Sequence, residues 1–266
     1  MNRFMLIGLA MMLIPMASLF VPKPGAASDG EAPKPEITAT FSIAAVDLES
    51  GMCGAAVASK APAACLYVAH ARPAVGVFCT QHYAVKPWGA KALDLLADKK
   101  LPEEVLVELL KNDMGAAGRQ LAIIDMKGRS AQRHPTGTTA SGNYWGGMSG
   151  RFYVCQGNTL TGREVIVAMA KAYEETKGSL ADRLMAALVA GDCAGGDHRG
   201  RLAAGIRVCK KDGEGYWLDL HVDKSDDAVV VLHKQYVESD HEARGEWGKQ
   251  PYQKPCPDRP APKKPG

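Results

Sequence analysis

The chain has 266 residues, of which 46% are hydrophobic and 23% are charged, and its formal net charge is +3 at pH 7. Nucleic-acid-binding proteins usually carry a much stronger basic excess on one face, so this balance predicts no nucleic-acid partner. Once unpacked ends are set aside, one domain of about 200 residues remains, which is long enough to bury a sizeable core.

The first 27 residues have the pattern of a secretory signal peptide. Arg3 precedes an apolar run over residues 4–21, and small residues suited to cleavage follow at 25–27. An uncleaved anchor is the alternative, because about 18 apolar residues can just span a bilayer. We predict a cleaved signal peptide over residues 1–27, export to the periplasm or the extracellular space, and no membrane attachment after cleavage.

Segments rich in proline and charged residues flank the predicted domain. Residues 28–39 predict a linker that resembles a propeptide, and residues 241–266 predict a disordered tail rich in proline and lysine. The globular domain is therefore assigned to residues 40–240.

Predicted strands and helices occur in groups along this domain. Strands are expected at residues 40–47, 53–59, 67–69, 74–80, 119–125, 129–134, 151–156, 201–209 and 216–222. Helices are expected at residues 87–98, 102–111, 163–176, 180–190 and 226–238, and a glycine-rich loop with two aromatic residues at 141–150. Grouped rather than alternating elements favour packed sheets with helices outside over a doubly wound fold.

The cysteines and histidines show no metal-binding pattern. The chain has seven of each, without a CxxC or HExxH motif, and no glycine-rich phosphate loop is present. We therefore expect no metal ion and no other cofactor. Several cysteines lie inside apolar runs and are expected to be small buried residues, while the odd count leaves at least one thiol unpaired in a monomer.

Thr40, at the head of the first predicted strand, is the candidate nucleophile. A threonine with a free α-amine can act as nucleophile and base together, because a terminal amine titrates near neutrality. Lys60, just past the second strand, can lower the pKa of a nearby amine, although a lysine that extends into solvent is the alternative. A Ser59–Lys60 dyad is disfavoured, because adjacent strand residues point to opposite faces. His82 and His198 flank polar loops and are expected to be solvated.

Six groups of residues resemble, in the same order, the bacterial family of unknown function DUF1028. They are residues 40–43, 58–60, 80–81, 119–120 with 124–125 and 128, 156–158, and 196–200. The resemblance covers about residues 40–238 and implies an α+β fold, the four-layer αββα sandwich of the Ntn-hydrolase-like superfamily. It implies no substrate.

The chain departs from the family pattern at two places. Typical members carry Met directly before the Thr-Phe-Ser start, whereas 39 residues precede Thr40 here, so a cut between Ala39 and Thr40 is required for N-terminal nucleophile chemistry. Residues 202–204 read Leu-Ala-Ala where members usually carry Gln-Ser-Ala.

These observations predict an exported hydrolase of amide bonds in a small molecule or peptide. Thr40 attacks the carbonyl, its α-amine takes the proton and water hydrolyses the acyl-enzyme, while Lys60 tunes the amine and Asn158 stabilises the oxyanion. The candidate substrate contacts are Gln81, Asp197 and Arg199.

Other interpretations stay open at this point. Asp197 and Arg199 can instead form a surface ion pair, and Tyr144 and Trp145 can form a lid over the site. The alternative function is a non-catalytic exported binding or assembly domain that keeps the fold and never exposes Thr40. A homodimer is expected only on general grounds.

Overall fold

The computed structural model describes residues 40–136 and 144–256. The chain divides into two units, Met1–Lys34 and Pro35–Gly266, and every described element belongs to the second. The predicted signal peptide and linker, residues 1–39, lie outside the described residues. None of the described helices is both long enough and apolar enough to cross a bilayer.

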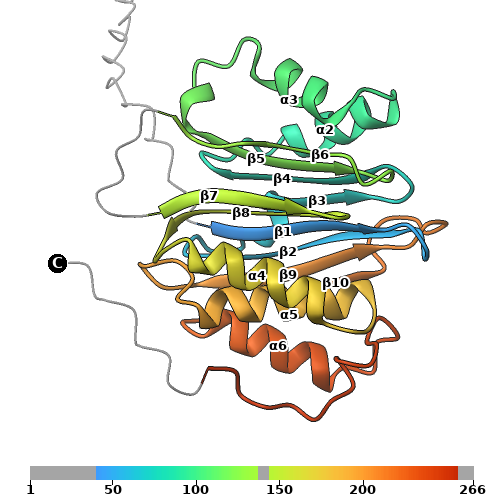
Figure 1. Cartoon of the computed structure of the whole chain (residues 1–266), viewed down its shortest axis with the longest axis vertical. Coiled ribbons are helices and arrows are strands. Elements are labelled where there is room, and N and C mark those ends of the chain that lie inside the picture. Colours follow the sequence, from blue (N-terminus) through green and yellow to red (C-terminus); the bar gives the residue numbers. More distant parts are fainter. Residues whose placement is uncertain (1–39, 137–143, 257–266) are drawn as a thin grey trace, which may run out of the picture. The chain divides into compact units, whose positions relative to one another are not determined.

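Two antiparallel sheets form the centre of the domain (Figure 1). The larger sheet has the order β10 (Leu218–Val222), β9 (Ala203–Cys209), β2 (Met52–Ser59), β1 (Thr40–Asp47), β8 (Tyr153–Leu160) and β7 (Tyr144–Gly150). The smaller sheet has the order β3 (Ala69–Arg72), β4 (Gly76–His82), β5 (Arg119–Asp125) and β6 (Ser130–Arg133).

Helices cover the outer faces of the two sheets. Figure 1 shows α2 (Trp88–Ala97) and α3 (Pro102–Leu110) on the smaller sheet. The larger sheet is covered by α4 (Glu164–Glu175), α5 (Leu180–Cys193) and α6 (Ala228–Glu238). Two short helices, α1 (Cys65–Val68) and the 3-10 helix η1 (Ala116–Gly118), complete the described elements. The prediction of an α+β fold built from packed sheets with helices outside is confirmed.

The residues of β1 alternate between two core layers. Phe41, Ile43 and Ala45 pack beneath α4 and α5, whereas Ala44 and Val46 pack in the layer between the sheets. The inter-sheet layer is built mostly from alanine, valine and cysteine. Such small side chains let two sheets lie close together.

Two predicted elements differ in the structure. The strand expected at residues 67–69 is wrong, because α1 occupies Cys65–Val68 and β3 begins only at Ala69. A short apolar run is compatible with either structure, and here the helix buries Cys65 and Val68 between the sheets.

The glycine-rich loop expected at residues 141–150 is wrong from residue 144 onward, since Tyr144–Gly150 form β7; residues 141–143 lie outside the described residues. Glycine is required inside this strand. A Cβ at Gly147 would come within 2.6 Å of the Cys155 carbonyl oxygen on β8, so no side chain fits there.

The domain extends beyond residue 240, contrary to the predicted tail. Residues 241–256 run back along α6: Ala243 is fully buried, and the Trp247 ring stacks on His233 with centroids 5.1 Å apart. A disulfide joins Cys256 to Cys193 at the end of α5. The composition of this segment is typical of a tail, but its aromatic side chains bury apolar area on the core. Residues 257–266 lie outside the described residues.

The buried carboxylate of Asp182 holds the same segment by hydrogen bonds. It accepts from the Tyr236 hydroxyl at 2.7 Å and from the backbone N–H groups of Trp247 and Gly248 at 3.2 and 2.9 Å. Asp182 also completes the expected cap of α5, because its N–H donates to Ser179 Oγ at 3.1 Å. The same side chain accepts from the Ser179 N–H at 3.3 Å, so it caps the N-terminus of α5 and also anchors the end of the domain.

Candidate active site

One end of the inter-sheet layer is polar. There the small apolar side chains give way to seven polar ones, all at most 1% exposed: Thr40, Ser42, Ser59, Gln81, Gln120, Gln156 and Asn158. They come from β1, β2 and β8 of the larger sheet and from β4 and β5 of the smaller one. Polar groups buried this deeply must hydrogen-bond to one another or to a ligand.

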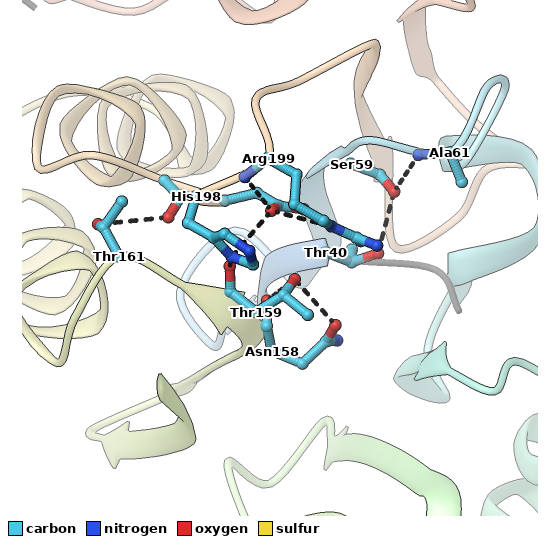
Figure 2. Close-up of polar contacts among 10 residues, drawn as sticks. Thr40, Ser59, Ala61, Asn158, Thr159, Thr161, His198 and Arg199 are labelled. Carbon is cyan, nitrogen blue, oxygen red and sulfur yellow. Dashed lines mark hydrogen bonds and ion pairs between the residues drawn. The ribbon is translucent and has the colours of Figure 1, made fainter. Parts of the chain in front are cut away.

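Thr40 meets Ser59 at this end. The two residues are strand partners on β1 and β2, and their hydroxyl oxygens lie 3.1 Å apart (Figure 2). Ser59 Oγ also accepts from the Ala61 N–H at 3.0 Å, which fixes its position. A hydroxyl can donate and accept together, so Ser59 can orient the hydroxyl of Thr40.

Ser59 is a site residue that we did not predict. The argument that adjacent strand residues diverge excludes Lys60 as its partner, but the partner lies across the hairpin. Because β1 and β2 pair from Asp47 and Met52 outward, their register places Thr40 opposite Ser59. Counting back from the turn would have found this contact.

Gln81 and Asn158, the predicted substrate contact and oxyanion donor, belong to a buried amide network. Gln81 Nε2 donates to the Thr40 carbonyl oxygen at 3.1 Å and to Gln120 Oε1 at 2.9 Å. Asn158 Nδ2 donates to the same Gln120 oxygen at 2.9 Å. Ser42 Oγ donates to Gln81 Oε1 at 2.7 Å. Gln81 therefore positions the backbone of Thr40, and one N–H of Asn158 is already used within the protein.

Asn158 nevertheless lies beside Thr40 in the sheet. The pairing of β1 with β8 ends at Phe41 opposite Gly157, so Thr40 and Asn158 are each one residue beyond the last pair, while Ser59 is the partner of Thr40 on β2. The predicted nucleophile is flanked on both neighbouring strands by polar side chains.

Asp197 and Arg199 reach the site from the loop after α5. Asp197 and Arg199 do form the alternative ion pair, but it is partly buried, since Asp197 is only 3% exposed; the Asp197 Oδ1 also accepts from the Arg199 N–H at 2.9 Å. Arg199 Nε lies 3.4 Å from the same oxygen. Burial raises the pKa of the Asp197 carboxyl, against the lowering effect of Arg199.

The guanidinium end of Arg199 is directed toward the predicted nucleophile. Figure 2 shows this side chain extending toward Thr40 and Ser59. Arg199 Nη2 is buried, and among the described residues it has no hydrogen-bond partner. A buried guanidinium N–H without an acceptor is costly, so this nitrogen is suited to an oxygen of a bound molecule.

Lys60 follows β2 directly and is half-buried. Within the described part of the chain, the structure records no hydrogen bond or ion pair of its ammonium with Thr40. The structure therefore gives no contact that supports an effect of Lys60 on the pKa of the Thr40 α-amine, and this effect stays a prediction.

His82 is buried, so the expectation that it is solvated is wrong. It ends β4 with φ +65°, a left-handed conformation that is strained for a residue other than glycine. Its Nδ1 lies 2.8 Å from the Gly118 carbonyl oxygen, and its ring lies 6.1 Å from that of Trp145 on β7. Burial lowers the pKa of His82 and the charge of Arg199 lowers it further, against the raising effect of the Gly118 carbonyl.

Within residues 40–136 and 144–256, no three His, Cys, Asp or Glu side chains are grouped in a way that would hold a metal ion.

Comparison with known proteins identifies the family. The model of a family of unknown function, DUF1028, matches residues 40–232, and the chain belongs to this family. The crystal structure of protein SPO2555 from Silicibacter pomeroyi, also a DUF1028 protein, superposes with a TM-score of 0.68 at 28% sequence identity. The match covers 76% of this chain and 91% of that one. No functionally curated protein matches the chain.

Proposed function

We propose that the chain is an exported hydrolase of amide bonds that uses Thr40 as an N-terminal nucleophile in an Ntn-hydrolase-like αββα fold. The observation that carries the proposal is the position of Thr40, which heads a central strand with its hydroxyl 3.1 Å from Ser59 and with the Arg199 side chain extending toward it. A nucleophile held by an orienting group beside a cationic donor is a common arrangement in acyl transfer.

The reaction begins once the Ala39–Thr40 bond has been cut. The freed α-amine, whose pKa in an ordinary terminus is about 8, takes the proton from Thr40 Oγ1 as this oxygen attacks the substrate carbonyl. The amine product leaves with that proton, and water then hydrolyses the Thr40 ester. Ser59 orients the hydroxyl, while Arg199 Nη2 supplies a hydrogen bond to a substrate oxygen.

Two features support export. The first 27 residues have the signal-peptide pattern, and the Cys193–Cys256 disulfide is of a kind that persists mainly in oxidising compartments.

A non-catalytic binding domain is the second candidate, and one observation favours it. In the encoded chain the Thr40 nitrogen is in a peptide bond with Ala39, and the Thr40 side chain is 0% exposed. A domain that is never cut at this bond has no free α-amine.

The mature terminus and one substitution separate the two candidates. The purified full-length product would be examined by N-terminal sequencing and intact mass, and assayed for amine release from a panel of peptides and N-acyl amides. We expect a start at Thr40 and turnover that Thr40→Ala abolishes, while the matched change Thr176→Ala, just after α4, leaves turnover intact. A start upstream of Thr40 in an active preparation, or turnover by Thr40→Ala, would contradict the mechanism.

A further inference from the structure

Two free cysteines are direct partners on neighbouring strands. Of the five unpaired cysteines in the described chain, Cys53 on β2 lies opposite Cys209 on β9. Both side chains are 0% exposed and face the inter-sheet layer. The Cys53 thiol also lies within hydrogen-bonding distance of the Arg72 and Gly76 carbonyl oxygens, at 3.4 and 3.7 Å.

This geometry is close to that of a disulfide. Cβ atoms of antiparallel strand partners lie about 4.5–5.5 Å apart, and a disulfide needs about 3.5–4.5 Å. The two ranges meet at about 4.5 Å and their midpoints differ by about 1 Å, an approach that the small side chains of this layer can accommodate. We propose that Cys53 and Cys209 are a second disulfide site, closed by exchange with a low-molecular-weight disulfide such as oxidised glutathione.

The other free thiols do not share this arrangement. Cys65 lies on the short helix α1. Cys79 has alanines as strand partners on both sides, and Cys155 lies between Ile43 and Met148. Cys155 also belongs to the core layer beneath the helices rather than to the inter-sheet layer. Cys53 and Cys209 are thus the one cysteine pair in register among the described strands.

The chemistry has a defined order. The neighbouring Cys53 side chain lowers the pKa of the Cys209 thiol, while the neighbouring Cys209 side chain and burial raise the pKa of the Cys53 thiol. The Cys209 thiolate therefore attacks oxidised glutathione and releases one glutathione. Cys53, losing its proton, then attacks the Cys209 sulfur and releases the second. Two protein thiols become one disulfide, and one oxidised glutathione becomes two reduced molecules.

Closure would bind β2 covalently to β9 within the larger sheet. Because both sulfur atoms are buried, the exchange takes place during folding or through local opening. Cross-strand disulfides hold some strain and are reduced more easily than relaxed ones.

Thiol counting tests the proposal on the full protein. Purified protein would be incubated with oxidised glutathione, once in the native state and once during refolding from urea. It would then be denatured and alkylated with N-ethylmaleimide, and its intact mass would be measured by mass spectrometry. Since the chain has five free cysteines, closure of one pair lowers the number of adducts from five to three. A non-reducing digest should join the Cys53 and Cys209 peptides.

Substitutions make the assignment specific. Cys53→Ser should trap Cys209 as a glutathione adduct without a new protein disulfide, and Cys209→Ser should block closure, whereas the matched change Cys155→Ser should leave closure intact. Five adducts in the unsubstituted protein after both treatments, or a digest that joins other cysteines, would overturn the proposal. None of these outcomes depends on whether Thr40 is a nucleophile.

Discussion

The hydroxyl of Ser59 lies against that of Thr40 because a hairpin of fixed register joins their strands. Ser59→Ala removes this contact and with it one group that orients the Thr40 hydroxyl. We expect kcat on the amide substrates found by the panel to fall about tenfold, which corresponds to the loss of one hydrogen bond of about 1.4 kcal/mol in the transition state.

The matched control is Ser50→Ala, in the exposed turn of the same hairpin, for which steady-state kinetics should show an unchanged kcat. An unchanged kcat in Ser59→Ala would remove Ser59 from the mechanism.

Gln120 is the shared acceptor of the buried amide network. Gln120→Leu leaves the N–H groups of Gln81 and Asn158 without their acceptor. We expect the free energy of unfolding to fall by about 3 kcal/mol, measured by urea denaturation, because buried donors without partners are costly. Gln132→Leu is the control, since among the described residues the Gln132 side chain donates to Ser149 Oγ in an exposed position, and its effect should stay within about 0.5 kcal/mol.

The sequence was enough to predict which residues lie in the site, but not which of them contact one another. Thr40, Asn158 and the Asp197–Arg199 loop do come together, and their motifs are visible in the chain. The role of Gln120 is not visible, because its partners lie on strands of both sheets and no local pattern reports how two sheets face each other. His82 was misjudged because its left-handed φ interrupts the alternation of β4.

At the scale of elements, the segment over residues 241–256 depends on α5 and α6. Asp182→Ala removes the acceptor for Tyr236, Trp247 and Gly248. We expect unfolding free energy to fall by about 3 kcal/mol or more and hydrogen exchange at Trp247 and Gly248 to accelerate. Asp98→Ala, at an exposed position after α2, should change neither quantity. Equal exchange rates in Asp182→Ala would show that the aromatic contacts alone hold the segment.

The stack of His233 on Trp247 makes the same segment sensitive to pH. Burial lowers the pKa of His233 in the folded state, whereas the unfolded value is about 6.5. Above that value both states are neutral and the stability is fully present. As the pH falls below it, the unfolded chain binds a proton that the folded ring resists, so stability is lost.

His233→Phe keeps an aromatic ring at this position and removes the imidazole that binds a proton in the unfolded chain. The decrease in Tm between pH 7.5 and pH 5 should therefore be smaller in this variant, as measured by circular dichroism. The same decrease in both proteins would exclude His233 as a source of the pH dependence.

Elements with strong local signals were predicted well, whereas elements defined by tertiary contacts were not. β1 and β5 have the predicted bounds, and the capped start of α5 is confirmed. β7 was missed because its glycines, usual in loops, are required here by the closeness of β8. The packed segment after residue 240 was missed because its composition resembles that of a disordered tail, and its anchor, Asp182, is distant in sequence.

At the scale of the whole molecule, the Cys193–Cys256 disulfide closes a loop with a sequence separation of 63 residues. Removing such a crosslink increases the entropy of the unfolded chain. For Cys256→Ser we expect the free energy of unfolding to fall by about 4 kcal/mol in urea denaturation. The Cys193→Ser change should have the same effect, and the double change should add nothing further. Additive effects would mean that the two cysteines stabilise the fold separately.

The same disulfide turns the described chain from Cys193 to Cys256 into a covalent ring. β9, β10, α6 and the loop that carries Arg199 all lie between its two cysteines. A protease that cuts the backbone once inside this ring leaves both pieces joined, and they separate only after reduction. The part of the protein that supplies Arg199 therefore keeps its attachment through a single nick, an advantage for a protein proposed to mature by backbone cleavage outside the cell.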